Sequence, residues 1–193
     1  MPPKAKFTKD EIITAALNIT RIHGFSALTA RALAAELGSS ARPIFTVFQT
    51  MEDVQREVTS AARELYNEYV QRGLSENPAF RGVGTQYILF SIREPKLFQL
   101  LFMSEQPNIP DLSNVLPVID ENYEKILMSI EEGYKLDKKS SQRLYHHLWI
   151  YTHGIAALCA TKMCRFTGDE INFMLSEVCA SILTRLKEGG HSD

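Results

Sequence analysis

Apolar positions along the chain recur at intervals of three and four residues, the spacing that places side chains on one face of an α-helix. In the first segment, Ile13, Ala16 and Leu17 follow this spacing. They come after Thr8-x-x-Glu11, a capping box whose side chains can bond the free amides of a helix's first turn. No segment alternates as a strand would, so the pattern predicts an all-α protein. The predicted helices cover 8–24, 29–37, 41–48, 50–73, 79–93, 95–104, 113–133, 137–165 and 167 onward.

The composition fits an ordinary globular chain. Of 193 residues, 45% are hydrophobic and 23% charged, which argues against wholesale disorder, a collagen-like fibre or a disulfide scaffold. The three cysteines all lie in the last quarter, and the N-terminus lacks the apolar segment of a signal peptide. These features predict a cytoplasmic protein with reduced thiols. The longest stretch free of acidic and basic residues, 144–161, is too short and too polar for a good membrane span.

Charge is distributed unevenly along the chain. Residues 1–50 carry a formal charge of +3, and the remainder carries −5. A basic segment on an acidic body suits a small head that binds a polyanion, although a solvated lysine tail explains the same bias. The composition shifts near Gly73, so we expect a head over 1–50, a connecting helix over 51–73 and a second domain over 74–193.

The short helices expected around a glycine-serine turn form a helix-turn-helix pattern, in which the second helix enters the major groove of DNA. Ser40 is expected to cap that second helix, with Pro43 at its third position, where no amide bond is lost. Ile44 and Phe48 are expected to anchor it to the core. Arg42 would then face the groove, where an arginine can pair with both acceptors of a guanine. Helix pairs joined by a glycine turn also occur in unrelated proteins.

Motif residues over about 45 positions, in order and spacing, resemble the TetR family of bacterial transcriptional regulators. They include His23-Gly24-Phe25 and the run from Leu28 to Gly38. A second, less specific match pairs a segment that begins Arg93-Glu94-Pro95 with His153-Gly154 after Trp149, as in the ligand-binding part of many members. The first match further contains 9–17 and the pattern Ile44-Phe45-x-x-Phe48-x-x-x-Glu52.

The resemblance implies a nine-helix, all-α homodimer in the bacterial cytoplasm. The first three helices would bind a pseudo-palindromic operator in double-stranded DNA, and the last two helices of each subunit would form the dimer interface. Phe45 stands where the family usually has tyrosine, and Met51 stands where lysine is usual before Glu52. Both departures remove groups that often meet phosphate. No cofactor is implied.

Several candidate DNA contacts have structural alternatives. Thr29 can be a plain helix cap or a cap that also meets phosphate. Arg31 can pair with Glu36 instead of phosphate, and Lys4, together with the nearby lysines, can be a loose arm along DNA or a disordered tail. The candidate DNA-binding residues are Thr29, Arg31, Ser40, Ala41, Arg42, Pro43, Phe45, Thr46, Met51, Lys6 and Lys9.

Aromatic side chains of the middle helices could line a pocket for a small apolar or aromatic ligand, since pockets between helices are common ligand sites. Ordinary core packing is the alternative for most of them. His146 and His153 lie two turns apart, but no metal-binding spacing of histidines and cysteines is present, so no metal site is expected. The ligand candidates are Tyr87, Phe90, Phe98, Phe102, Met103, Tyr123, Leu127, His146, Trp149 and His153.

The two C-terminal helices carry more apolar surface than one subunit could cover, which predicts an obligate homodimer. The candidate interface residues are Tyr151, Gly154, Ile155, Leu158, Met174, Val178, Ile182 and Leu186. The functional expectation is a DNA-binding regulator, usually a repressor, released from its operator by a small molecule. The main alternative is a helical protein–protein adaptor with a degenerate DNA-binding head. An enzyme finds little support, because no nucleophile elbow, phosphate loop or dinucleotide fingerprint is present.

Overall fold

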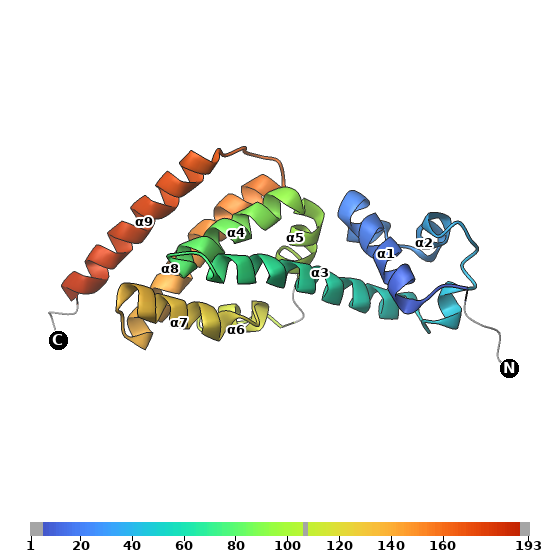
Figure 1. Cartoon of the computed structure of the whole chain (residues 1–193), viewed down its shortest axis with the longest axis horizontal. Coiled ribbons are helices and arrows are strands. Elements are labelled where there is room, and N and C mark those ends of the chain that lie inside the picture. Colours follow the sequence, from blue (N-terminus) through green and yellow to red (C-terminus); the bar gives the residue numbers. More distant parts are fainter. Residues whose placement is uncertain (1–5, 106–107, 190–193) are drawn as a thin grey trace. The chain divides into compact units, whose positions relative to one another are not determined.

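The computed structural model describes residues 6–105 and 108–189, and within these ranges the chain forms nine α-helices and no strand. The prediction of an all-α protein is therefore confirmed for the described residues (Figure 1). The helices are α1 (Lys9–His23), α2 (Ala30–Glu36), α3 (Met51–Leu74), α4 (Ala79–Arg93), α5 (Pro95–Phe102), α6 (Val115–Ile119), α7 (Tyr123–Tyr134), α8 (Lys138–Ala160) and α9 (Gly168–Gly189), with 3-10 turns η1 (Phe25–Ala27) and η2 (Ile44–Thr46).

Helix starts follow the local capping signals. The Thr8 hydroxyl accepts from the Glu11 amide at 3.2 Å, and the Glu11 carboxylate accepts from the Thr8 amide at 2.7 Å. Helices α3 and α9 begin with the same reciprocal pair. Thr29 caps α2 by accepting from the Ala32 amide at 3.2 Å. These bonds satisfy amides that have no partner inside the helix, so the predicted starts are confirmed.

Two predicted helices in the second half of the chain differ from the structure in their extent. The predicted helix over 113–133 is interrupted between α6 and α7, because the Asp120 carboxylate accepts from the Asn122 amide at 2.8 Å and its backbone is extended. A short polar side chain that bonds nearby backbone competes with helical hydrogen bonding. The predicted helix over 137–165 ends at Ala160, and Lys162 turns the chain with φ of +59°.

The chain divides into two compact units, which are described separately. Unit 1 contains the described residues up to Tyr66 together with Glu94–Ser104, and unit 2 contains Asn67–Arg93 and the described residues from Glu105 onward. Helix α3 is continuous and contributes its first part to unit 1 and its last residues to unit 2.

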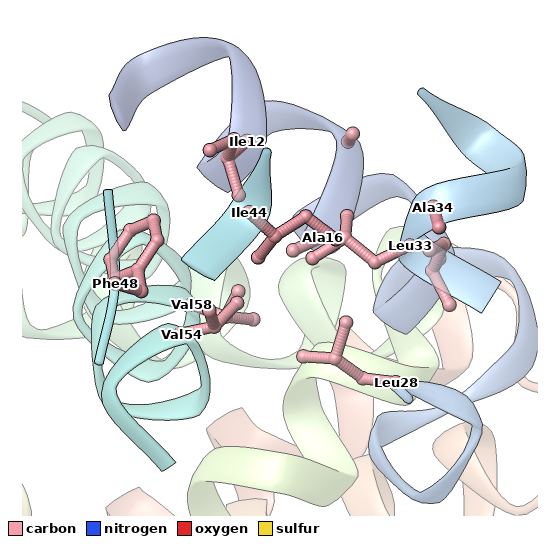
Figure 2. Packing of buried hydrophobic residues seen from close by; sticks show 11 residues of the cluster. Ile12, Ala16, Leu28, Leu33, Ala34, Ile44, Phe48, Val54 and Val58 are labelled. Atoms are coloured by element: carbon pink, nitrogen blue, oxygen red, sulfur yellow. The ribbon is translucent and has the colours of Figure 1, made fainter. Parts of the chain in front are cut away.

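The core of unit 1 forms where α1, α2, η2 and the start of α3 converge. Figure 2 shows Ile12 of α1, Ile44 of η2 and Val58 of α3 in this cluster. Helix α1 buries Ile12, Ala15, Ala16 and Ile19, whereas Ile13 and Leu17, which share the helical spacing with Ala16, are only half-buried. Apolar residues occur on two adjacent faces of α1, so the packing partners select the buried one. Helix α5 packs against α1.

Unit 2 is a bundle in which α4 packs against α7 and α8, and α8 packs against α9. Side chains without solvent exposure, such as Phe90, Ile126 and Leu144, come from α4, α7 and α8. Helix α9 buries Ile171 and Leu175. None of the helices in the described ranges is long and apolar enough to cross a membrane.

Candidate functional site

The segment between α2 and α3 is shorter and tighter than predicted. The expected α-helix over 41–48 is a single 3-10 turn, η2, preceded by Pro43. Ser40 does not cap it, since the turn has no side-chain cap, and Pro43 lies before the turn instead of at a third helical position. Pro43 lacks an amide hydrogen and has a fixed φ, here −61°, so it begins the turn. The predicted anchors Ile44 and Phe48 are both buried.

The side chains left outside this core are largely those expected to meet DNA. Thr29 and Arg31 lie exposed at the start of α2, and Arg42 is exposed before η2. Thr46 is exposed, and its hydroxyl donates to the Pro43 carbonyl at 2.6 Å. The remaining candidates are exposed Ser40 and Phe45 and the half-buried Ala41, Pro43 and Met51.

Three cations of unit 1, Lys9, Arg21 and Arg56, form ion pairs with carboxylates. Lys9 Nζ lies 2.6 Å from a carboxylate oxygen of Glu57, and Arg21 Nε lies 2.7 Å from a carboxylate oxygen of Glu94. By contrast, neither Arg31 nor Arg42 forms an ion pair within the part of the chain that the structure describes. The alternative pairing of Arg31 with Glu36 is therefore not observed there.

The basic arm expected at the N-terminus is described only from residue 6. Lys4 lies outside the described residues. Lys6 donates to the Ser39 hydroxyl at 2.9 Å, and its Nζ lies 5.2 Å from the centre of the Phe7 ring. The bond to Ser39 holds the Lys6 side chain beside the turn that follows α2.

The N-terminus of α3, which could otherwise attract a phosphate, already holds a carboxylate. The Thr50 amide donates to Asp53 Oδ2 at 2.8 Å, and the Asp53 amide donates to the Thr50 hydroxyl at 3.2 Å. The bond from the Thr50 amide lowers the pKa of the Asp53 carboxyl. An anion bound here would therefore meet a negative charge.

In unit 2, three of the candidate ligand residues form a hydrogen-bonded cluster between α4 and α8. The Tyr87 hydroxyl lies 2.9 Å from His153 Nδ1, and the Trp149 and His153 rings lie 5.4 Å apart. Trp149 also hydrogen-bonds Tyr87, and because an indole can only donate, the Tyr87 oxygen accepts this bond. The direction of the bond between Tyr87 and His153 follows the tautomer of His153: with the proton on Nε2 the Tyr87 hydroxyl donates to Nδ1, and with the proton on Nδ1 the ring donates to the Tyr87 oxygen.

Burial determines the charge state of this cluster. Removal from water lowers the pKa of His153, because it penalises the imidazolium form. The same effect raises the pKa of Tyr87 far above its ordinary value, and the Asp120 carboxylate raises it further. Both groups are thus neutral near pH 7, and the cluster offers hydrogen bonds without a formal charge.

Further candidates surround this cluster or lie elsewhere. Tyr123 stacks on Tyr145 with ring centres 5.7 Å apart, and Phe90 and Leu127 are core residues of unit 2. His146 donates from one ring nitrogen to the Gln142 carbonyl, while its Nε2 is buried and meets no hydrogen-bond partner among the described residues. The candidates Phe98, Phe102 and Met103 belong to unit 1, where Phe98 and Phe102 contact each other.

The candidate dimer residues occupy several faces of α8 and α9. Ile155 is buried inside unit 2, whereas Gly154 is exposed. Sequence reasoning missed Ile150 on α8 and Phe173 on α9, whose side chains are 52% and 68% exposed, because periodicity alone does not reveal which apolar face the subunit covers. The other candidates are half-buried: Tyr151, Leu158, Met174, Val178, Ile182 and Leu186.

Comparisons with known proteins identify no family. No protein-family model matches the chain, and no curated protein matches it. Among the described residues, no three histidine, cysteine or acidic side chains gather as metal ligands would. The TetR resemblance thus rests on the motif residues of the chain itself.

Proposed function

We propose that the chain is a ligand-responsive, DNA-binding transcriptional regulator of the TetR type, and most simply a repressor. The observation that carries this proposal is the contrast among the cations of unit 1. Lys9, Arg21 and Arg56 each pair with a carboxylate, whereas Arg31 and Arg42 are exposed and have no carboxylate partner in the described ranges. Exposed, unpaired arginines on a helix-turn segment are suited to phosphates and to guanine edges.

The rigid support behind these arginines favours the same proposal. Arg42 is separated by only one residue from Ile44, which is completely buried, and Arg31 lies two residues from the cap Thr29. Side chains that read DNA are most effective when their backbone is fixed by packing. Because η2 is a single turn, we expect Arg42 and Thr46 to reach the groove from a turn instead of a full recognition helix.

Ligand response would act as a population shift. A small molecule bound in unit 2, beside Tyr87, Trp149 and His153, would favour a conformation whose two DNA-binding heads are wrongly spaced for successive major grooves. Helix α3 is shared by both units and is the continuous element that could carry the coupling. Linkage then requires that operator DNA weaken ligand binding by the same factor as the ligand weakens DNA binding.

A mobility-shift experiment tests the proposal directly. The full chain is titrated against the DNA upstream of its own coding sequence and against a scrambled fragment of equal length, at two salt concentrations. A regulator should bind the first fragment at least about a hundredfold more tightly, since specific sites typically exceed non-specific DNA by 10³ or more. Equal, salt-sensitive affinity for both fragments, or no binding, would contradict it.

The adaptor alternative also has a specific observation in its favour. Phe45 and Ile22, two large apolar side chains of unit 1, are 44% and 66% exposed. An exposed aromatic ring at η2 could bind another protein instead of DNA. Phe45→Ser separates the two functions, since it should abolish binding of a protein partner but leave the arginine contacts with DNA in place.

A further inference from the structure

Two of the three cysteines lie together at the end of α8. Cys159 is half-buried in the last turn of the helix, and Cys164 is exposed after it. Between them, Lys162 adopts a left-handed conformation, with φ of +59°, and reverses the chain. The Leu158 carbonyl accepts from the amides of both Met163, at 3.0 Å, and Cys164, at 3.3 Å.

These backbone bonds bring Cys164 back against the turn that carries Cys159. A disulfide needs Cα atoms less than about 7 Å apart. The Cys164 amide is bonded to the carbonyl of Leu158, the residue directly before Cys159, so the backbone at Cys164 lies beside the turn that contains Cys159. The two thiols also interact electrostatically. Burial raises the pKa of Cys159, and the neighbouring Cys164 raises it further.

The two thiols differ in their suitability for attack on an oxidant. Cys164 is exposed after the end of α8, so an oxidant in solution can reach its sulfur. Burial raises the pKa of Cys159, which keeps it as a thiol. Cys179 is separate from the pair, because it lies on α9 with its sulfur 3.9 Å from the Tyr134 hydroxyl.

We propose that Cys159 and Cys164 form a peroxide-sensitive dithiol that closes to an intramolecular disulfide across the end of α8. The Cys164 thiolate attacks the distal oxygen of a hydroperoxide, ROOH, and the O–O bond breaks. The alkoxide leaves as the alcohol ROH after taking a proton, and Cys164 becomes a sulfenic acid. The Cys159 sulfur then attacks the Cys164 sulfur, the S–O bond breaks, and water leaves with the Cys159 proton.

The step is balanced, because two thiols lose two electrons and the hydroperoxide gains them, giving one disulfide, one alcohol and one water. This site is independent of the proposed DNA and ligand functions. Oxidation would join the two sides of the turn that leads from α8 to α9.

The test uses the full reduced chain and hydrogen peroxide. Trypsin cuts between the two cysteines at Lys162, so Cys159 and Cys164 fall in peptides 144–162 and 163–165. After oxidation and alkylation, we expect these peptides to be joined until a reductant is added, with Cys179 still free. The rate of cross-linking should not depend on protein concentration, because the reaction is intramolecular.

Single variants separate this reaction from unspecific oxidation. In Cys159→Ser, Cys164 should persist as a sulfenic acid, with at least a tenfold larger dimedone adduct than in the unsubstituted chain. Cys179→Ser, the matched control, should cross-link at the unchanged rate. The proposal is wrong if peptides 144–162 and 163–165 stay unlinked while added glutathione is oxidised. It is also wrong if either cysteine pairs with Cys179 or with a second chain. Equal labelling of Cys164 by dimedone in Cys159→Ser and in the unsubstituted chain would contradict it too.

Discussion

Tyr87 on α4 and His153 on α8 are joined by a 2.9 Å hydrogen bond that links two helices of unit 2. Tyr87 is 6% exposed, so its hydroxyl is removed from water and depends on protein groups for its hydrogen bonds. A buried donor left without an acceptor costs about 1–3 kcal/mol. The bond therefore fixes the facing surfaces of α4 and α8 at the place where we propose that a ligand binds.

The first prediction concerns acid stability. Burial lowers the pKa of His153 below its ordinary value of 6.5 in the folded chain, while the unfolded chain retains that value. The stabilisation is therefore fully present above pH 6.5 and is lost as the pH falls through the folded-state pKa. Urea unfolding followed by circular dichroism should give a free energy of unfolding that declines below pH 6.5.

Substitutions identify which histidine causes the decline in the free energy of unfolding at low pH. His153→Gln should flatten this decline, and His146→Gln should do so in part, because burial lowers the pKa of His146 as well. His23→Gln, at an exposed position of α1, is the control. A decline of equal steepness in His153→Gln would refute the assignment.

The second prediction concerns the close approach of α3 and α4 in unit 2. A Cβ on Gly82 would lie 2.4 Å from the Gly73 carbonyl oxygen, and a Cβ on Gly73 would lie 2.6 Å from the Val83 Cα. Both neighbours are backbone atoms and cannot move aside cheaply. Gly82→Ala should therefore lower the free energy of unfolding by about 1–3 kcal/mol or more.

For a second helical glycine we expect the opposite effect of alanine on the free energy of unfolding. A Cβ on Gly133 of α7 would meet no atom of the described residues within 4 Å. Gly133→Ala should stabilise the chain by up to about 1 kcal/mol, because alanine loses less backbone entropy in a helix. If both alanine variants unfolded at the same urea concentration, the close approach would be disproved.

Local chemistry explains why some of the fold could be predicted from the sequence. The reciprocal bonds of Thr8 and Glu11 span only three residues, so the start of α1 is visible without tertiary information. The break in the helix at Asp120 could not be predicted, because an aspartate in the middle of a helical sequence can equally point to solvent from an unbroken helix.

The site was only partly predictable for the same reason. Tyr87 and His153 were both candidates, but they are 66 positions apart, and no local pattern pairs them. Likewise, the sequence shows that the first turn of α3 is acidic. It does not show that the Asp53 carboxylate accepts a hydrogen bond from the Thr50 amide. Which arginines remain unpaired also depends on distant partners, as in the pairing of Arg21 with Glu94.

The third prediction separates the two roles considered for Thr29. Aspartate is as good a helix cap as threonine but places a negative charge at the start of α2. Thr29→Asp should keep the free energy of unfolding within about 0.5 kcal/mol, whereas Thr29→Ala should lose about 1 kcal/mol. If Thr29 also meets phosphate, the aspartate variant should bind operator DNA at least tenfold more weakly, and unchanged affinity would leave Thr29 as a cap alone.

The fourth prediction distinguishes base reading from phosphate contact. Arg42→Ala should cost about 1–3 kcal/mol on the specific site and relax the preference at one base pair. Arg42→Lys keeps the charge but not the planar fork, so it should retain non-specific affinity and lose the base preference. Lys6→Ala should weaken all sequences alike and reduce the salt dependence. Unchanged base preference in both Arg42 variants would exclude Arg42 from the groove.

The last prediction concerns assembly through α8 and α9. Gly154 is exposed on α8, and a Cβ there would meet nothing within 4 Å inside the subunit. A leucine at this position should therefore cause no clash within its own subunit and even favour the helix. In a dimer packed through this face, the same side chain would separate helices that approach closely at a glycine. Gly154→Leu should thus shift sedimentation at micromolar concentration from dimer to monomer or aggregate. The control is Gly133→Leu on α7, a position equally open within its subunit, and it should sediment as the unsubstituted chain does. A folded, unsubstituted chain that sediments as a monomer at that concentration would contradict the obligate dimer, and a Gly154→Leu dimer of unchanged stability would place the interface on another face.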